Sequence, residues 1–170
     1  MKWIGALLFI GTTTWLGFDW SNRLAKRPKH IRHLINALQV LEAEILYSQL
    51  PLHEAFISIA KQIPDPIKAF FQLVAKRLEG SHIDFELIWE DCVSALIEES
   101  SLGQTEQEIL VQFGRTLGQH DFTQQQKHIQ LTIRHLEREL HDAREEQDKY
   151  GKMAKNIGFL AGLFIVLLLI

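Results

Sequence analysis

Almost all the charged residues of this 170-residue chain lie in its middle, and the two ends are apolar. Residues 3–18 read WIGALLFIGTTTWLGF, and residues 157–170 read IGFLAGLFIVLLLI. A helix needs about 20 mostly apolar residues to cross the ~30 Å hydrocarbon core of a bilayer. With their flanking residues, the two stretches come close to this length. We therefore predict an N-terminal transmembrane anchor over residues 1–20 and a C-terminal transmembrane segment over residues 156–170.

Each apolar end has an alternative interpretation. A cleaved signal peptide would also begin with an apolar run, but the charged region before it is only Met1 and Lys2, and no small-x-small cleavage site follows. The last run could be a buried core helix, but it lacks a polar face. As a helix it spans only about 21 Å. Beginning at Met153 extends it to about 27 Å, with the Lys155 ammonium reaching the interface.

Basic residues flank both apolar ends on the side of the middle region, and such an excess marks the cytoplasmic side of membrane segments. They are Arg23, Lys26, Arg27 and Lys29 after the first segment, and Lys152 and Lys155 before the last one. We expect residues 21–155 to lie in the cytoplasm, with both short ends pointing outward. The basic flank could instead bind anionic lipid or nucleic acid. The net charge of −3 and the lack of a basic stripe argue against nucleic acid.

The middle region is predicted to be an all-α domain of six helices. The first helix begins near Pro28 and ends at Pro51, and apolar residues follow the i, i+3, i+4, i+7 spacing of one buried stripe. The stripe comprises Ile31, Leu34, Ile35, Leu38, Leu41 and Ile45. Four shorter helices are predicted over residues 52–63, 66–78, 84–97 and 105–117, and a long one over residues 121–155.

Two of the helix starts carry capping signals. Asp65 can cap the helix that follows it, with Pro66 in the first helical position. Thr105 and Glu108 have the spacing of a capping box, in which each side chain bonds to the backbone N–H near the other residue. We expect both pairs to fix where their helices begin.

The long last helix carries apolar residues that step by four and three, which is the spacing of a heptad seam. They are Ile129, Ile133, Leu136, Leu140 and Ala143. A coiled coil with another chain would use such a seam, and so would antiparallel packing within one domain. Five positions are few for a free-standing coiled coil, so we favour packing within the chain.

No motif for nucleotide binding, zinc proteolysis or thiol chemistry is present in the sequence. The single cysteine, Cys92, is predicted to be a core residue. His128 and His135 lie seven residues apart and face roughly one way, but no further ligand stands at a suitable spacing for a metal site. We predict no catalytic residue, no metal, no cofactor and no enzymatic activity.

Three stretches resemble the stage III sporulation protein AB family. They are LEAEILYSQLPLHEA at residues 41–55, FGRTLGQHDFTQQQKHI at residues 113–129 and GFLAGL at residues 158–163. The resemblance covers essentially the whole chain, and the second stretch is its most specific part. Ser48 stands where the family often has glycine, a departure that could alter the turn before Pro51.

The resemblance implies a function that composition does not. The family belongs to the apparatus spanning the two membranes between mother cell and forespore in endospore-forming bacteria. Its cytoplasmic part is similar to the six-helix domain of the inner-membrane platform protein of type II secretion and type IV pilus systems. The implied role is a non-enzymatic platform in the mother-cell membrane. Its implied partners are a cytosolic secretion-type ATPase, other channel membrane proteins, membrane lipid and, in a homo-oligomer, further copies of itself.

The partner-facing surface is expected where the first helix meets the turn between the fifth and sixth helices. Glu42 and Glu44 lie off the buried stripe of the first helix. Two glycines could allow close approach, and three polar residues stand at the start of the last helix. Together these candidates are Glu42, Glu44, Gly114, Gly118, Asp121, Gln126 and Lys127. For Asp121 we rank capping of the last helix above partner contact.

Two other classes of function remain open from the residues. A membrane-anchored helical sensor or adaptor could pass a signal through the long last helix, although the expected topology leaves only short ends outside to receive it. A small membrane enzyme could use the histidines and the acidic residues. Loss of function in His120→Ala or His128→Ala with assembly intact would favour the enzyme.

Overall fold

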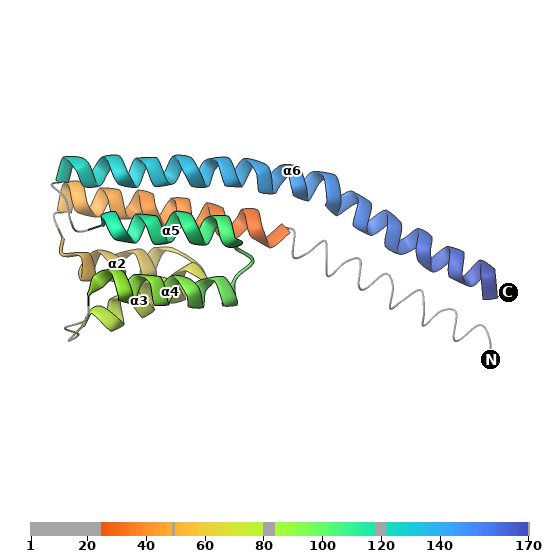
Figure 1. Cartoon of the computed structure of the whole chain (residues 1–170), viewed down its shortest axis with the longest axis horizontal. Coiled ribbons are helices and arrows are strands. Elements are labelled where there is room, and N and C mark those ends of the chain that lie inside the picture. The colour runs from red at the N-terminus through yellow and green to blue at the C-terminus, as the bar shows by residue number, and fades with distance from the viewer. Residues whose placement is uncertain (1–24, 49, 80–83, 118–121, 170) are drawn as a thin grey trace. The chain divides into compact units, whose positions relative to one another are not determined.

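The computed structural model describes residues 25–48, 50–79, 84–117 and 122–169, and every regular element in these ranges is helical. A first helix over residues 25–43 continues into the π-helical turn η1 (Glu44–Ser48). The later helices are α2 (Leu52–Gln62), α3 (Ile67–Leu78), α4 (Phe85–Glu99), α5 (Gln104–Thr116) and α6 (Phe122–Leu169), as Figure 1 shows. The prediction of an all-α domain with six helices is confirmed.

The chain divides into two compact units. One is Lys29–Leu140, which holds most of the first helix, the helices α2 to α5 and the first part of α6. The other combines Met1–Pro28 with His141–Ile170. In this second unit the Arg27 guanidinium lies 3.0 Å from the Glu146 carboxylate.

The predicted stripe of the first helix is buried along its whole length. Its six residues, Ile31, Leu34, Ile35, Leu38, Leu41 and Ile45, expose between 0% and 6% of their surface. The seam of α6 is also buried within this one chain at Ile129, Ile133, Leu136 and Ala143, while Leu140 is half-buried. Packing within the chain, rather than a coiled coil with another chain, therefore explains the heptad spacing.

A cluster of aromatic rings fills the space between α2, α3, α4 and α5. Trp89 of α4 stands in its middle, with ring centroids 5.1 Å from Phe70, 5.9 Å from Phe56 and 5.7 Å from Phe113. Its indole N–H donates to the Leu110 carbonyl oxygen of α5 at 2.7 Å. Aromatic pairs prefer offset-stacked or edge-to-face geometry. The edge-to-face contacts of Trp89 with Phe70 and Phe113 therefore help to fix the mutual orientation of the helices as well as burying apolar area.

Both predicted capping pairs are wrong. No side-chain hydrogen bond caps α3, whose N-cap is Pro66 rather than Asp65. The helix α5 begins at Gln104, and the N-cap is Gly103. The carboxylate that accepts the Gly103 N–H, at 2.6 Å, is that of the fully buried Glu106. The spacing of three residues was right, but the pair lies two residues earlier than the one we predicted from Thr105.

The last helix is longer than predicted. The sequence pattern predicts an end at residue 155 and a separate segment over residues 156–170. In the structure α6 is one helix of 48 residues, with no interruption between these two parts. Among the described residues no helix has both the length and the apolar character needed to cross a bilayer. The predicted anchor over residues 1–20 lies outside the described residues.

Candidate partner-binding surface

Glu42 joins the first helix to α6. Its carboxylate accepts hydrogen bonds from Gln126 Nε2 at 3.0 Å and from Gln130 Nε2 at 2.9 Å. The two amides are one helical turn apart, so both reach the same carboxylate from one face of α6. The structure thus brings together Glu42 and Gln126, which we had predicted to share a surface. It also gives them a duty within the chain, because they hold the two helices in register.

Glu44 also makes a contact within the chain. It opens the π-helical turn η1, and its carboxylate accepts a hydrogen bond from the Ser58 hydroxyl of α2 at 2.6 Å. A π-helix is a wider turn than an α-helix and often marks a functional position. Here it precedes Pro51 and ties the end of the first helix to the next one. Partner contact by Glu44 stays a prediction.

Sequence reasoning missed Tyr47, the most exposed large hydrophobic residue of the described chain. It lies on η1 with 87% of its surface exposed. An exposed tyrosine offers a partner a large apolar area and a hydroxyl, the combination that dominates many protein interfaces. The signal was available, since Tyr47 stands off the buried stripe between Ile45 and Pro51.

The remaining predicted residues near the start of α6 divide into two groups. Lys127 is exposed. Gln126 is half-buried, and its side-chain amide donates a hydrogen bond to the Glu42 carboxylate. Gly118 and Asp121 lie outside the described residues, and so does the predicted capping role of Asp121. Of the candidates on α6, Lys127 is therefore the one whose side chain is open to a partner.

Gly114 is a packing position inside the domain. A Cβ added there would lie 2.2 Å from Cδ1 of Trp89, far inside van der Waals contact. The glycine therefore allows the indole of α4 to lie directly on the backbone of α5. We predicted a close approach at Gly114, and the structure shows one, but to a side chain of the same chain. A role in partner contact stays a prediction.

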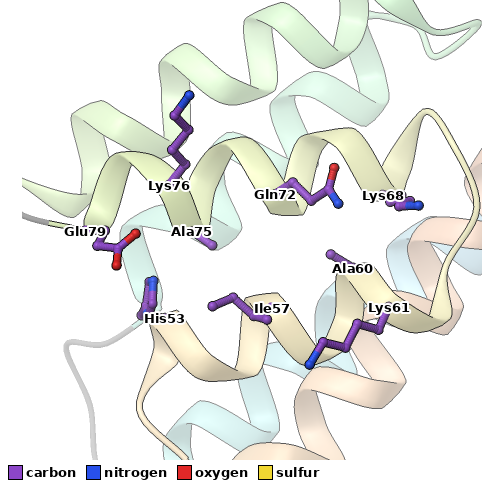
Figure 2. Close-up of a pocket in the computed structure, with 9 residues that line it drawn as sticks. All are labelled: His53, Ile57, Ala60, Lys61, Lys68, Gln72, Ala75, Lys76 and Glu79. Carbon is purple, nitrogen blue, oxygen red and sulfur yellow. The ribbon is translucent and has the colours of Figure 1, made fainter.

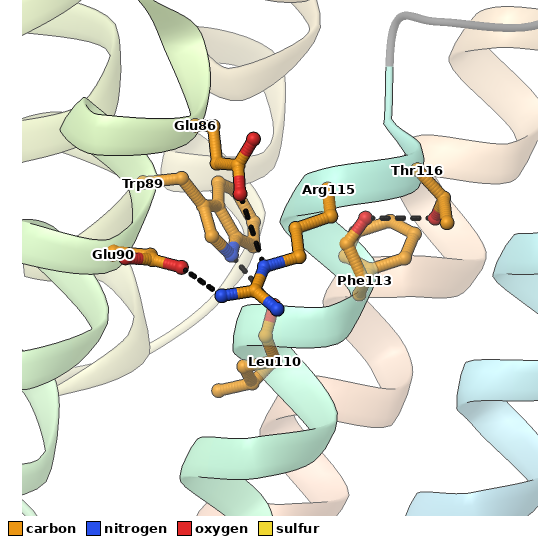
Figure 3. A network of polar contacts seen from close by, with 7 residues as sticks. All are labelled: Glu86, Trp89, Glu90, Leu110, Phe113, Arg115 and Thr116. Carbon is orange, nitrogen blue, oxygen red and sulfur yellow. Dashed lines mark hydrogen bonds and ion pairs between the residues drawn. The ribbon is translucent and has the colours of Figure 1, made fainter.

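A polar network that was not predicted from the sequence holds α4 and α5 together (Figure 3). The Arg115 guanidinium lies 3.0 Å from the Glu86 carboxylate and 2.9 Å from that of Glu90. These hydrogen bonds raise the pKa of Arg115, with Glu90 contributing most. The guanidinium bridges two carboxylates one turn apart on α4, so the network orients α5 rather than forming a reactive centre.

Among the side chains that could carry chemistry, Cys92 and His30 have structural roles. Cys92 is completely buried in the core, as predicted, and burial raises the pKa of its thiol, which disfavours the reactive thiolate. His30 Nδ1 accepts the Ser101 N–H at 3.1 Å and so holds the loop between α4 and α5. His135 is exposed, and His120 lies outside the described residues. No group of three potential metal ligands occurs in the part of the chain that the structure describes.

The basic residues predicted to flank a membrane are only partly within the described chain. Lys26 and Lys29 are exposed on the first helix, whereas Arg27 is paired with Glu146. Arg23 lies outside the described residues, as do the side chains of Lys152 and Lys155. The exposed lysines are compatible with a membrane flank, and the prediction stays untested.

Comparisons with known proteins point to the same family as the three sequence stretches. The chain matches the family described as stage III sporulation protein AB over residues 2–170. It is 43% identical to stage III sporulation protein AB of Bacillus subtilis (strain 168) over 169 residues, which cover 99% of each chain. A solved structure of a stage III sporulation protein AB is 42% identical and superimposes with a TM-score of 0.68, covering 73% of this chain and 98% of that one. A match of this extent, carried by sequence and fold together, places the chain in the stage III sporulation protein AB family.

Proposed function

We propose that this protein is a non-enzymatic platform in the channel apparatus between mother cell and forespore, where it links a cytosolic secretion-type ATPase to the membrane complex. The observation that carries the proposal is the similarity to a sporulation protein along the entire chain. Burial of the only thiol and the structural use of His30 also favour a scaffold over an enzyme. A bundle with an aromatic core offers the rigid body that a platform requires.

Membrane attachment is the second part of the proposal. Its support is the two apolar ends, residues 3–18 and 157–170, together with the basic residues beside them. The helix α6 runs without interruption from the folded bundle into the last apolar run, which would couple the bundle mechanically to the membrane. A topology reporter fused after Ile170 should read as exterior. A cytoplasmic signal would contradict the arrangement with two spans.

The surface we assign to the ATPase combines the exposed residues next to the Glu42 contact. Tyr47 supplies an apolar anchor on η1, and Lys127 supplies a charge on α6. Glu42 and Gln126 position the two helices that carry them. Substitutions at Tyr47 and Lys127 therefore test binding directly, whereas a change at Glu42 would also disturb the domain.

The experiment is co-purification of the full-length chain with the secretion-type ATPase of the same organism. We expect Tyr47→Ala and Lys127→Glu to weaken the complex, each by about tenfold, because an exposed aromatic or charged contact is lost. The matched controls are Leu87→Ala, at another exposed apolar residue, and Arg134→Glu, at another exposed base on α6. Both controls should bind like the wild type.

Each outcome of the co-purification has a clear meaning. Loss of binding in the two surface variants but not in the controls supports the surface and the partner. Binding that survives both surface variants contradicts the surface, while the partner stands. Absence of binding by the folded wild-type chain contradicts the ATPase link. A Glu42→Arg/Glu44→Arg variant is informative only if its helix content and melting temperature match the wild type, since both carboxylates are bonded within the chain.

The uninterrupted α6 also favours a second candidate, a helical adaptor that transmits a signal along this helix. Inserting one residue after Asp148 would rotate the two parts of the helix by about 100° relative to each other, while seven residues would nearly restore the original face. A signal-transmitting helix should fail with one inserted residue and work with seven. If the protein is a platform, cells that carry either insertion should sporulate as long as the complex assembles.

A further inference from the structure

A groove runs between α2 and α3 on the surface of the larger unit, and neither the stripe nor the family resemblance pointed to it. Its volume is about 530 Å³. Figure 2 shows the two helices side by side, with His53 and Glu79 at one end and Lys61 and Lys68 at the other. The groove is about as long as α2, whose 11 residues span about 16 Å.

The floor of the groove is small and apolar. Ala60 of α2 and Ala75 of α3 form it, with 4% and 3% of their surfaces exposed. Ile57 stands beside them and leaves 37% of its surface exposed, although it is a large aliphatic residue. Small side chains let another helix approach closely, and an exposed isoleucine gains from being covered. The shape and the polarity of the floor suit an amphipathic helix.

The rim of the groove is basic. Lys61, Lys68 and Lys76 line it, against a single acid, Glu79. None of these lysines forms an ion pair with a residue in the described ranges. Arg77 on α3 differs, because its guanidinium is paired with the Asp91 carboxylate at 3.1 Å. These lysines therefore surround an apolar floor with positive charge that no described acidic residue pairs with.

Three of the five acidic residues on the neighbouring helix α4 are paired within this chain, while Glu98 and Glu99 at its end are exposed. On α4, Glu86 and Glu90 hold Arg115, and Asp91 holds Arg77. The exposed face of α6 mixes acids with Arg134 and Arg138. The apolar faces of α4 and of the first part of α6 are buried in their own domain. A second copy of the chain is therefore a poor source of an acidic amphipathic helix, and we infer that the complementary charge comes from a different protein.

We propose that the α2–α3 groove binds an acidic amphipathic helix of about three turns from another protein. The apolar stripe of that helix covers Ile57, Ala60 and Ala75. Its carboxylates face Lys61 and Lys68 at the end of the groove nearest the turn between α2 and α3. This surface lies on other elements than the one assigned to the ATPase, so the proposal does not depend on that assignment. It gives the platform a second docking site.

The test uses the full-length chain in sporulating cells. A photo-reactive amino acid replaces Gln72, an exposed residue that lines the groove, and mass spectrometry identifies the cross-linked segment. We expect a segment of a different protein that has acidic residues on one helical face. A synthetic peptide with that sequence should then bind the purified chain. Raising the salt concentration should weaken the binding, as expected for contacts at an exposed rim.

Charge reversal separates the groove from the rest of the surface. In Lys61→Glu/Lys68→Glu, affinity for the peptide should fall by at least about tenfold, because two attractions become repulsions. The control Arg134→Glu/Arg138→Glu changes the net charge equally on α6 and should bind normally. Circular dichroism checks that both variants fold, and Lys61→Gln/Lys68→Gln replaces the reversal if it does not fold.

Four results would overturn the proposal: no cross-link to a protein segment, a cross-link to a segment without acidic residues, a cross-link to another copy of the chain, and binding that is insensitive to the lysine substitutions. Binding of the ATPase distinguishes a failure of this proposal from a failure of the proposed function. Groove variants should leave co-purification of the ATPase unchanged, and Lys127→Glu should leave peptide binding unchanged. Failure of one assignment therefore does not imply failure of the other.

Discussion

The larger unit is held together in two different ways. The first helix and the first part of α6 bury aliphatic residues at regular spacings, such as Leu34 and Leu38 on one helix and Leu136 on the other. The helices α2 to α5 instead surround Trp89 with rings in tilted and edge-to-face contacts. The first arrangement depends on a repeating pattern. The second depends on a few large side chains that have only one way to fit.

The difference matters because the two kinds of packing fail differently. An aliphatic seam loses one layer when one residue is shortened, and its neighbours can relax into part of the space. The aromatic cluster has almost no room to relax, because the Trp89 indole lies on the backbone at Gly114 and its N–H is committed to the Leu110 carbonyl oxygen. We expect the free energy of unfolding to fall most when side-chain volume is added in the aromatic cluster. In the seam of α6 we expect it to fall most when side-chain volume is removed.

The largest effect is expected for Gly114→Ala. The added methyl group would lie 2.2 Å from Trp89 Cδ1 and would displace the indole, which also breaks the 2.7 Å hydrogen bond to Leu110. Overpacking together with a buried donor left without its acceptor should cost about 4 kcal/mol of the free energy of unfolding. Urea unfolding of the purified full-length chain, followed by circular dichroism, measures this loss.

Gly103→Ala is the matched control for Gly114→Ala. A Cβ at Gly103 would meet only the end of the Glu106 side chain, at 3.1 Å. The backbone φ of −103° suits alanine as well as glycine, so the cost should stay below about 1 kcal/mol. Equal stability losses in the two variants would contradict the claim that the Trp89 contact is what requires a glycine.

A smaller loss is expected when the seam of α6 is shortened at Leu136. This side chain is completely buried, and Leu136→Ala should cost about 3 kcal/mol through lost burial and the remaining cavity. Leu131→Ala on the same helix is the control, because Leu131 leaves 52% of its surface exposed and should lose less than about 1 kcal/mol. If the two leucines proved equally important, the seam would not be the core contact of α6.

The same contrast explains how much of the fold was predictable. Periodicity placed the stripe of the first helix and the seam of α6 correctly, because burial repeats with the helical turn. Prolines at positions 51, 64 and 66 marked the breaks around α2. The capping pair of α5 was misplaced by two residues, since several acids stand near its start and only packing chooses Glu106. The extent of α6 was missed because a polar-to-apolar change in composition need not interrupt a helix.

The candidate surface was predictable only in part. Glu42 was a candidate because it lies off the buried stripe, and Gln126 because it stands at the start of the last helix. The two residues are 84 positions apart and are hydrogen-bonded in the structure. Local patterns within the chain carry no information about such a distant pair. The position of Trp89 on Gly114 and the groove between α2 and α3 were missed for the same reason, because each depends on how two helices pack against one another.

The smallest predicted effect concerns His33, a polar residue beside the aliphatic stripe of the first helix. Its Nδ1 is shielded from solvent and has no hydrogen-bond partner in the described part of the chain. Burial lowers the pKa of His33, and the positive charges of Lys29 and Arg32 lower it further. In the unfolded chain His33 is therefore protonated near pH 6.5, whereas in the folded chain it is protonated only at a lower pH. Stability should fall as the pH drops below about 6.5.

Replacing His33 tests this sign. His33→Leu removes both the shielded polar atom and the titration, so its stability relative to the wild type should rise, by about 1 kcal/mol at most, between pH 7.5 and pH 5.5. His33→Gln keeps a polar side chain without a titrating group and should show the same change with pH at a lower overall stability. Urea unfolding at the two pH values measures both variants. If the difference in unfolding free energy between each variant and the wild type did not change with pH, proton uptake by His33 would not affect stability. The aliphatic region would then differ from the aromatic cluster only in its response to added or removed side-chain volume.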